Sequence, residues 1–225
     1  MNIDHCEFPD DLYYDVENDV WFEISQRAGS KIGSMGITST LVFVSGKIAS
    51  IRFRPVTHLK KGQSVATIES IKYVGAVRSP VDGMIARFNQ ELTTNPTPLW
   101  KSPYTSWIAE YESFEESSLD SLLQGLQAKE KILLRINELR LHCFKLLPDE
   151  EMLSIGTECT TTLANLSELL EDKQNGYVVH LVTDDPTAEI ELVRWSMQTG
   201  NEIVESRKEE NLYHFIVRKI VRNEN

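Results

Sequence analysis

Two short runs of alternating apolar and polar residues meet near the middle of the first half of the chain. The first run reads QSVATIESIK and the second YVGAVRSPVDG, and both are rich in β-branched residues. This pattern predicts two strands joined as a hairpin, bounded by Gly62 and Gly83. The join falls at Lys72, so the predicted hairpin holds this lysine at its tip. A lysine there is accessible to a modifying enzyme, although an isolated turn lysine is more often simply solvated.

A second pattern follows from residue 115 to Pro148. Leucines and isoleucines recur there at three- and four-residue spacing without an internal proline. This spacing predicts amphipathic helix, which Ser117 or Ser118 can cap and Pro148 ends. Gly125 is the one breaker, where a first helix can end and a second begin. Residues 115–148 are therefore expected to form a semi-rigid helical connector between two domains.

Beyond Pro148 the pattern alternates between strand and helix. Successive segments read as a strand, a helix, a buried strand, a helix that starts at a proline, and two strands around a polar turn: residues 146–156, 160–176, 177–185, 186–200 and 201–220. The order β-α-β-α-β-β predicts an α/β two-layer sandwich, with two helices on one side of a small mixed sheet.

Charge is distributed unevenly along the chain. The formal net charge is −11, of which residues 1–112 contribute −2 and residues 113–225 contribute −9. Such asymmetry suggests two units with different partners, and the acidic excess argues against nucleic acid. No apolar run approaches the length of a membrane span, and the acidic N-terminus does not resemble a signal peptide. A cytoplasmic location without membrane contact is expected.

The cysteines and histidines predict no site of their own. Cys6, Cys143 and Cys159 are far apart and odd in number, so reduced thiols are expected rather than a disulfide framework or a zinc site. Cys6 is expected in a mobile N-terminal segment, and Cys143 in the apolar stripe of the helical connector. Five histidines fall on unrelated segments, which predicts neither a metal site nor autonomous catalysis: His5, His58, His142, His180 and His214.

The residues around Lys72 resemble the lipoyl-attachment hairpin of the glycine cleavage H protein family. Here ESIK is followed by SPVDG, where the family usually has ESVKA followed by SPVSG. Further similarities occur in the family's order: Phe8-Pro9, Tyr13-Tyr14, Val20-Trp21, Gly36-Ile37-Thr38, Asn89, Leu92, Asn95-Pro96, Pro103-Tyr104, Trp107-Ile108 and Leu119 to Leu123. The resemblance covers roughly residues 8–127. It implies an all-β lipoyl/biotinyl-type hybrid (barrel-sandwich) domain with helices, placed at residues 1–114.

This resemblance also implies a function. Lys72 would carry lipoate through an amide, and Glu69 would help the lipoylating enzyme to recognise the site. A biotin hairpin is expected to flank its lysine with methionines, whereas Ile71 and Tyr73 stand here. The implied protein is a carrier rather than an enzyme, which shuttles an aminomethyl group on lipoyl-Lys72 between active sites. Its expected partners are a lipoate ligase or lipoyl transferase and the glycine cleavage enzymes.

The last segment, residues 149–225, resembles the TusA/SirA-like sulfur-carrier family over roughly residues 149–221. The similar positions are Gly156, Cys159, Gly176, Asp184-Asp185-Pro186, Thr199-Gly200 and Phe215 to Lys219. In that family a cysteine at the start of the first helix carries a persulfide sulfur, and Cys159 falls at this place. A helix N-terminus lowers the pKa of a thiol. The family's C-P-x-P is CTTT here, and Glu158 adds a nearby negative charge, so active sulfur carriage and a docking remnant both stay open.

A second departure lies in residues 46–55. The H protein family usually has an acidic strand that ends in proline and faces its partner enzymes, but Lys47, Arg52 and Arg54 stand here. Reversed charge on a docking surface penalises the usual partners. Sulfur is therefore an alternative cargo, with sulfur-metabolism enzymes as partners and Cys159 exchanging sulfur with the lipoyl dithiol. A docking module without lipoate is the third alternative.

Overall fold

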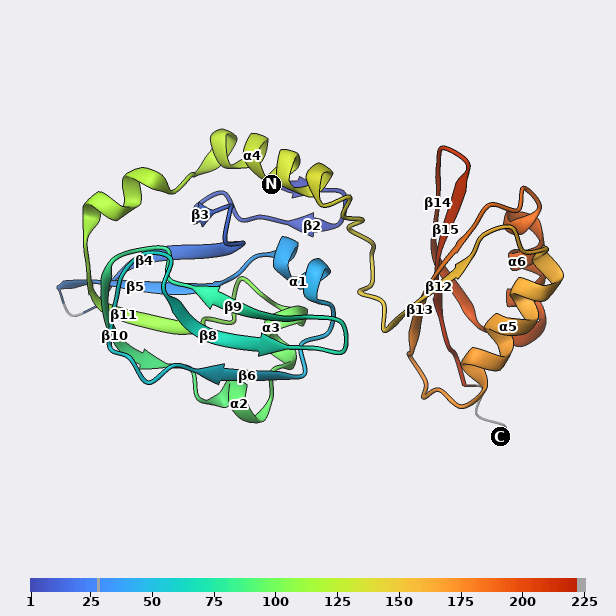
Figure 1. Ribbon diagram of the computed structural model, residues 1–225, viewed down its shortest axis with the longest axis horizontal. Helices are drawn as coiled ribbons and strands as arrows, with labels where there is room; N and C mark the ends of the chain where they lie inside the picture. The colour runs from blue at the N-terminus through green and yellow to red at the C-terminus, as the bar shows by residue number, and fades with distance from the viewer. Residues whose placement is uncertain (28, 222–225) are drawn as a thin grey trace. The chain divides into compact units, whose positions relative to one another are not determined.

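The structure is a computed structural model that describes residues 1–27 and 29–221 of the 225-residue chain. The chain divides into two compact units, Met1–Cys143 and Phe144–Asn225 (Figure 1). The division into a domain of residues 1–114, a connector of residues 115–148 and a domain of residues 149–225 stays a prediction. The last four residues of its third segment lie outside the described residues.

The first unit is built mainly from two antiparallel sheets (Figure 1). The larger has the order β3 (Tyr13–Asp15), β4 (Val20–Arg27), β5 (Ser30–Ile37), β11 (Ala109–Phe114), β10 (Gly83–Phe88) and β7 (His58–Leu59). The smaller has the order β6 (Ser50–Phe53), β8 (Ser64–Glu69) and β9 (Val74–Arg78), and a separate ribbon pairs β1 (Asn2–Ile3) with β2 (Cys6–Glu7). The sheets curl around an apolar interior, which confirms the all-β hybrid fold expected for this part of the chain.

The predicted hairpin is present as β8 and β9. Ile68 pairs with Ile51 of β6 on one side and with Gly75 of β9 on the other. Ile51 and Ile68 are both buried, as is Val77 further along β9, so one face of this sheet closes over the interior. Alternate residues must then point outward, because side chains along a strand alternate between its two faces.

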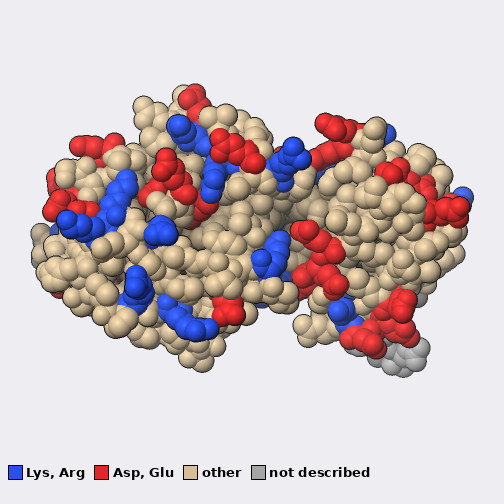
Figure 2. Space-filling model, viewed as in Figure 1, with Lys and Arg blue, Asp and Glu red and all other residues tan. Residues whose placement is uncertain are grey.

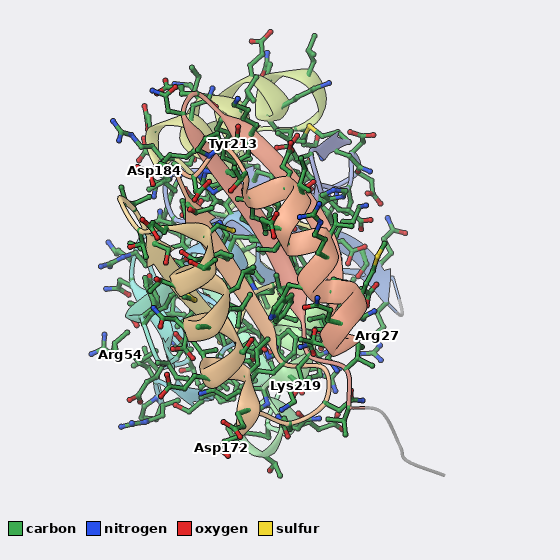
Figure 3. The ribbon with its side chains drawn as sticks, turned by 90° about the vertical axis from the view of Figure 1, so that its right-hand side faces the viewer. Arg27, Arg54, Asp172, Asp184, Tyr213 and Lys219 are labelled. Atoms are coloured by element: carbon green, nitrogen blue, oxygen red, sulfur yellow. A yellow bond between two sulfur atoms is a disulfide. The ribbon has the colours of Figure 1, made fainter. Side chains whose placement is uncertain are left out.

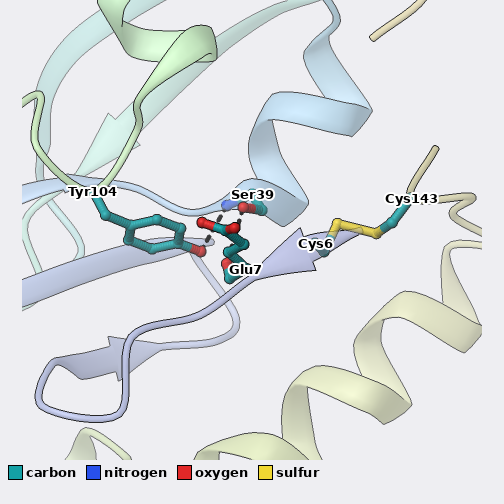
Figure 4. Close-up of a disulfide and its surroundings, with 5 residues drawn as sticks. All are labelled: Cys6, Glu7, Ser39, Tyr104 and Cys143. Atoms are coloured by element: carbon teal, nitrogen blue, oxygen red, sulfur yellow. Dashed lines mark hydrogen bonds between the residues drawn. A yellow bond between two sulfur atoms is a disulfide. The ribbon is translucent and has the colours of Figure 1, made fainter. Parts of the chain in front are cut away.

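Short helices complete this unit: α1 (Ser39–Ser45), α2 (Glu91–Thr94), α3 (Thr97–Lys101) and the 3₁₀ helix η1 (Glu116–Ser121). The start of α1 is held from two sides. The Ser39 hydroxyl donates to the carbonyl oxygen of Glu7 at 3.0 Å, and the Ser39 N–H donates to the Tyr104 hydroxyl at 3.0 Å (Figure 4). These bonds fix α1 between strand β2 and the loop before β11.

Helix α4 (Gly125–Glu138) packs on the first unit through its buried side chains Ala128, Ile132 and Ile136. Its cluster includes residues of the N-terminal segment and β3–β4: Cys6, Phe8, Leu12, Tyr14 and Trp21. The helix was expected to continue to Pro148, but it ends at Glu138, and Arg140 has a left-handed backbone with φ +48° that cannot continue it. Residues after Arg140 are therefore free to turn back to the N-terminal strands.

The expectation that all three cysteines are reduced thiols is wrong for two of them. Cys6 and Cys143 form a disulfide across a sequence separation of 137, with their Cα atoms 5.3 Å apart (Figure 4). Both are fully buried, so Cys6 does not lie in a mobile segment. Cys143 comes after the end of α4 at Glu138 and does not lie in a helix. The proximity arises because α4 packs against the N-terminal strands, which no local pattern reveals. Cys159 is the free cysteine of the described chain.

The second unit has the predicted β-α-β-α-β-β order, which confirms the two-layer α/β sandwich. Its sheet runs β12 (Glu150–Ser154), β13 (Val178–Thr183), β15 (Leu212–Arg218) and β14 (Glu202–Glu209), with only β12 and β13 parallel. Helices α5 (Cys159–Glu171) and α6 (Ala188–Thr199) cover one face of the sheet (Figure 3). Leu166 and Trp195 of these helices pack on Phe215 in one core cluster. Among the described residues, no helix of either unit has the length and apolarity needed to cross a membrane.

Removing the disulfide should destabilise the first unit. Closing a loop of this length restricts the unfolded chain by an amount equivalent to about 5 kcal/mol, which is an upper limit. We expect Cys6→Ala/Cys143→Ala to lower the free energy of unfolding by roughly 2 to 5 kcal/mol. The measurement is urea unfolding in a Trp195→Phe background, where the remaining tryptophans all lie in the first unit. Cys159→Ala is the control, and an unchanged midpoint for the double variant would contradict this account.

A chain cut near Pro148 should fold without the second unit. Residues 1–147 retain both sheets, helix α4 and the Cys6–Cys143 bond. We expect this fragment to show β-rich circular dichroism and to keep its competence for modification at Lys72. The matched control is residues 1–138, which lack Cys143 and should unfold at lower urea. A fragment 1–147 that is unfolded would disprove the two-domain interpretation.

Candidate functional site

Lys72 lies in the four-residue tip, residues 70–73, that joins β8 to β9. The tip is closed by a hydrogen bond from the Ser70 N–H to the Tyr73 carbonyl oxygen at 2.8 Å. Lys72 is exposed, its neighbour Ile71 is 98% exposed, and Val74 is 69% exposed. An apolar side chain as open as Ile71 has no packing role within the described chain. The tip is therefore presented to solvent with a lysine and apolar neighbours available for contact.

The residue that begins the tip, Ser70, is hydrogen-bonded to the last residue of α1. The Ser70 hydroxyl donates to the Ser45 carbonyl oxygen at 2.5 Å, and the Lys72 N–H donates to the Ser70 hydroxyl at 3.3 Å. Ser45 is itself fully buried. These contacts fix the direction in which the chain leaves β8, so the backbone of Lys72 is oriented while its side chain stays accessible.

Gly46 leaves room for the lysine side chain. Its backbone is left-handed, with φ +74°, and a Cβ built at this position would lie 3.0 Å from the Lys72 Cε. Any other residue would be strained by the backbone conformation and would press on the lysine stem. The stem of Lys72 therefore passes over Gly46, directly after helix α1.

Tyr73 turns inward beside the lysine. A Cβ at Gly75 would lie 2.2 Å from its hydroxyl oxygen, so its ring covers Gly75. Burial raises the pKa of the Tyr73 hydroxyl, the carboxylate of Asp19 raises it further, and the guanidinium of Arg135 lowers it. Asp19 and Arg135 form an ion pair at 3.2 Å, and burial raises the pKa of Asp19 to about 6. The Tyr73 hydroxyl therefore lies within electrostatic reach of the Asp19–Arg135 ion pair.

Glu69, the predicted recognition residue, lies at the end of β8 rather than at the tip. Its Oε2 accepts a hydrogen bond from Nη2 of Arg52 at 3.1 Å, and its side chain is 47% exposed. It points to the outer face of the small sheet, because its neighbour Ile68 is buried. A protein that approaches the outer face of the small sheet can therefore contact the Glu69 carboxylate.

Lys72 fits the group that the sequence resemblance implies. Attachment of lipoate requires an amine that an enzyme can reach and that can be acylated without breaking the fold. The exposed side chain of Lys72 meets the first requirement, and the hydrogen bonds at the base of the tip use backbone groups and serines rather than the ammonium. Acylation of Nζ would therefore leave these two hydrogen bonds intact.

Cys159 is placed as predicted, at the first position of α5, but it is only 6% exposed. Its N–H donates to Oδ2 of Asp185 at 2.8 Å. The other oxygen of Asp185 accepts hydrogen bonds from the N–H and the hydroxyl of Thr187, at 2.8 and 2.7 Å. Asp185 therefore ties the start of α5 to the start of α6 and occupies the N–H group nearest the thiol.

The electrostatics at Cys159 differ from the expectation. Burial raises the pKa of the Cys159 thiol, the carboxylates of Asp185 and Glu191 raise it further, and only a hydrogen bond with Thr187 opposes them. The predicted lowering of this pKa by the helix N-terminus is wrong, because burial and the two nearby carboxylates outweigh it. A thiol held in its neutral form is a weak nucleophile. Sulfur carriage by Cys159 stays a prediction.

Two histidines that the sequence placed on unrelated segments come together in the second unit. His180 Nε2 and His214 Nδ1 lie 3.0 Å apart, and both side chains are buried. Antiparallel pairing of β13 with β15 brings them together on the face opposite the helices. Each histidine lies in an apolar stretch that predicts a strand. Antiparallel pairing of these two predicted strands was the signal that could have placed the two histidines side by side.

The chain was compared with known proteins. The family model described as Glycine cleavage H-protein matches residues 12–134, more than half of the chain, and the model Sulfurtransferase TusA matches residues 155–219. The Probable glycine cleavage system H protein 2 of Sulfolobus acidocaldarius is 36% identical over 146 residues, covering 63% of this chain and 96% of that protein. The Glycine cleavage system H protein 2 of Aquifex aeolicus is 35% identical over 130 residues, covering 56% and 79%.

A solved glycine cleavage system H protein from Mycobacterium marinum aligns at 24% identity with a TM-score of 0.46, covering 60% of this chain and 100% of that one. The family model covers the hairpin with Lys72, and the second model covers the start of α5 with Cys159. The chain belongs to the glycine cleavage H-protein family, whose members are carriers rather than enzymes, and it continues into a region that matches the TusA family.

Proposed function

We propose that this protein is a lipoyl carrier and that Lys72 is the residue that holds lipoate. The observation that carries the proposal is the exposed lysine at the tip of a hairpin whose base is fixed to the end of α1. A carrier needs an attachment point that is rigid at its root and open at its end. Lys72 meets both conditions, and membership of the H-protein family supports the same assignment.

The residues around Lys72 have separate tasks in this proposal. Ser70 and Ser45 orient the root of the arm, and Gly46 leaves space for the lysine stem. Glu69 presents a carboxylate on the outer face for recognition by the lipoylating enzyme. When attached, lipoate supplies a dithiol that can hold a substrate group and release it to a second active site.

The cargo we favour is an aminomethyl group, as in glycine cleavage, with the enzymes of that system as partners. Family membership supports this choice, and so do the names of the relatives. In this account the protein performs no catalysis of its own. Lys72 and its hairpin deliver the bound group, and the partner enzymes supply the reacting residues.

Sulfur is the second candidate cargo, with sulfur-metabolism enzymes as partners. The region that matches the TusA family supports it. Two relatives from Aquifex aeolicus are numbered 2 and 3, so one organism holds more than one such protein, and a further copy can take a different cargo. The burial of Cys159 and its raised pKa weigh against Cys159 as an open persulfide site. A docking module without lipoate is a third alternative, and a cytoplasmic location stays a prediction.

Lys72→Arg should abolish attachment of lipoate. A lipoate ligase should add one lipoyl group to the wild-type chain, detected by intact mass, and none to the variant. The expected change in stability is within about 0.5 kcal/mol, because the side chain is exposed. Lys47→Arg is the matched control and should be modified like the wild type. Lipoylation that persists in Lys72→Arg would remove the assignment.

Asp185→Asn should make Cys159 more reactive. The substitution removes a negative charge beside the thiol while keeping an oxygen for its N–H, so the thiol pKa should fall. We expect alkylation by iodoacetamide to be slow in the wild type and several-fold faster in Asp185→Asn at neutral pH. Asp184→Asn is the control. It removes the same charge from the neighbouring aspartate, whose carboxylate accepts a hydrogen bond from the Gly156 N–H and not from Cys159. Equal rates in all three proteins would show that Asp185 does not control the thiol.

Sulfur uptake tests whether the second unit takes part in carrying the second cargo. If Cys159 takes part in sulfur transfer, a persulfide donor should add a sulfur that a reductant removes and that Cys159→Ser no longer accepts. Absence of uptake by the wild type and by Asp185→Asn would leave this unit as a docking module.

A further inference from the structure

One continuous stretch of this acidic chain is strongly basic. Residues 46–81 contain seven lysines and arginines and a single acidic residue, Glu69, whereas the whole chain has a formal net charge of −11. The basic residues of the stretch are Lys47, Arg52, Arg54, Lys60, Lys61, Lys72 and Arg78. The stretch contains the predicted attachment residue itself, so the charge reversal is centred on the functional part of the chain.

The fold places three of these arginines with Lys72 on one structure, the small sheet of β6, β8 and β9. Across the sheet, Arg52 pairs with Thr67, which pairs with Ala76, and all three are exposed. Arg78 is the last residue of β9, Arg54 comes directly after the last residue of β6, and both are exposed. We call the outward-pointing surface formed by Arg52, Arg54, Thr67, Ala76 and Arg78 the basic face. Figure 2 shows blue side chains spread over this part of the first unit with little red among them.

The positive charge of the basic face is only partly neutralised. Glu69 pairs with Arg52 at 3.1 Å, while the Arg52 side chain stays 79% exposed. Arg78 donates to the carbonyl oxygen of Gly62 at 2.8 Å, which satisfies one N–H and removes no charge. The face therefore combines a net positive charge with the small exposed side chains of Thr67 and Ala76, which leave room for another surface to approach.

The basic face begins two residues beyond the row of the sheet that borders the tip with Lys72. The row of Glu69 and Val74 borders the tip, and the row of Arg52 follows two residues further along, at a rise of about 3.3 Å per residue. The amine of an unmodified lysine stands on a stem of four carbons, so an enzyme that acylates it must approach the tip closely. An enzyme that acts on the extended lipoyl arm can stay further away. The attaching enzyme is thus the partner that has to cover these rows.

We propose that the basic face is the docking surface for the enzyme that attaches lipoate to Lys72, and that this enzyme presents an acidic surface around its active-site entrance. The inference rests on the proposed function. Complementary charge accelerates encounter and fixes orientation, which a small, flat face needs because it buries little apolar area. A nucleic acid is disfavoured, since the remainder of the chain is acidic and would repel a polyanion.

The test is the kcat/KM of lipoate transfer by the lipoate ligase of the same organism, on the full chain, at low and high ionic strength. In Arg54→Glu/Arg78→Glu the rate constant should fall at least about tenfold at low salt, with kcat nearly unchanged, and the difference should shrink at high salt. Lys129→Glu/Lys131→Glu, on the exposed surface of α4, makes the same change in net charge and should stay within about twofold of the wild type. Circular dichroism checks that both variants are folded.

The outcomes are separable. A wild-type chain that takes up no lipoate defeats the proposed function itself. A wild-type chain and an Arg54→Glu/Arg78→Glu variant that are modified at equal rates defeat only the docking surface, as does a loss that persists at high salt. Fluorescence anisotropy with a labelled single-stranded DNA 20-mer at low salt tests whether the basic face binds nucleic acid instead. Binding that is lost in Arg54→Glu/Arg78→Glu, with unchanged lipoylation, would assign the face to nucleic acid and overturn the inference.

Discussion

The pairing of β8 with β6 and β9 is the constraint on which the rest of the site depends. Its inner row is Ile51, Ile68 and Gly75, and burying a side chain such as Ile68 stabilises the fold by about 1.5 to 3 kcal/mol. A shift of one residue in this register would turn Ile68 to solvent and the outer arginines to the interior. The register therefore fixes the exposed tip and the basic face together. Lys72 is presented at the tip because burial of Ile68, four positions earlier, fixes the register of the strand that leads to it.

The tip also depends on a second layer of support. Helix α1 ends beneath it, with the Ser45 carbonyl oxygen accepting from Ser70 and with Gly46 in a left-handed conformation. The start of α1 is tied to strand β2, which the disulfide links to Cys143. These contacts form one connected support for the tip, which runs from the hairpin through α1 and the N-terminal ribbon to the chain after α4. A carrier gains from such support because its arm then swings from a fixed root.

Local pattern predicted much of this fold. The alternation of apolar and polar residues predicted the hairpin and the position of Lys72 at its tip. The change between strand and helix periodicity predicted the order of elements in the second unit. Gly200 was expected to end a helix there, and its left-handed backbone does end α6. What failed depended on residues far apart in sequence. The Cys6–Cys143 bond requires α4 to pack on the N-terminal strands. The pKa of Cys159 is raised by burial first and then by the carboxylates of Asp185 and Glu191, which lie more than 20 residues further along the chain. A helix N-terminus alone says nothing of which anion occupies it.

The central claim is that Lys72 is modified in the living organism, and mass spectrometry of the protein purified from that organism tests it most directly. The account predicts an intact mass higher by one lipoyl group, with the group on the peptide that contains Lys72. A protein isolated under conditions where other lipoyl proteins of the same cells are fully modified, but with Lys72 unmodified, would contradict it.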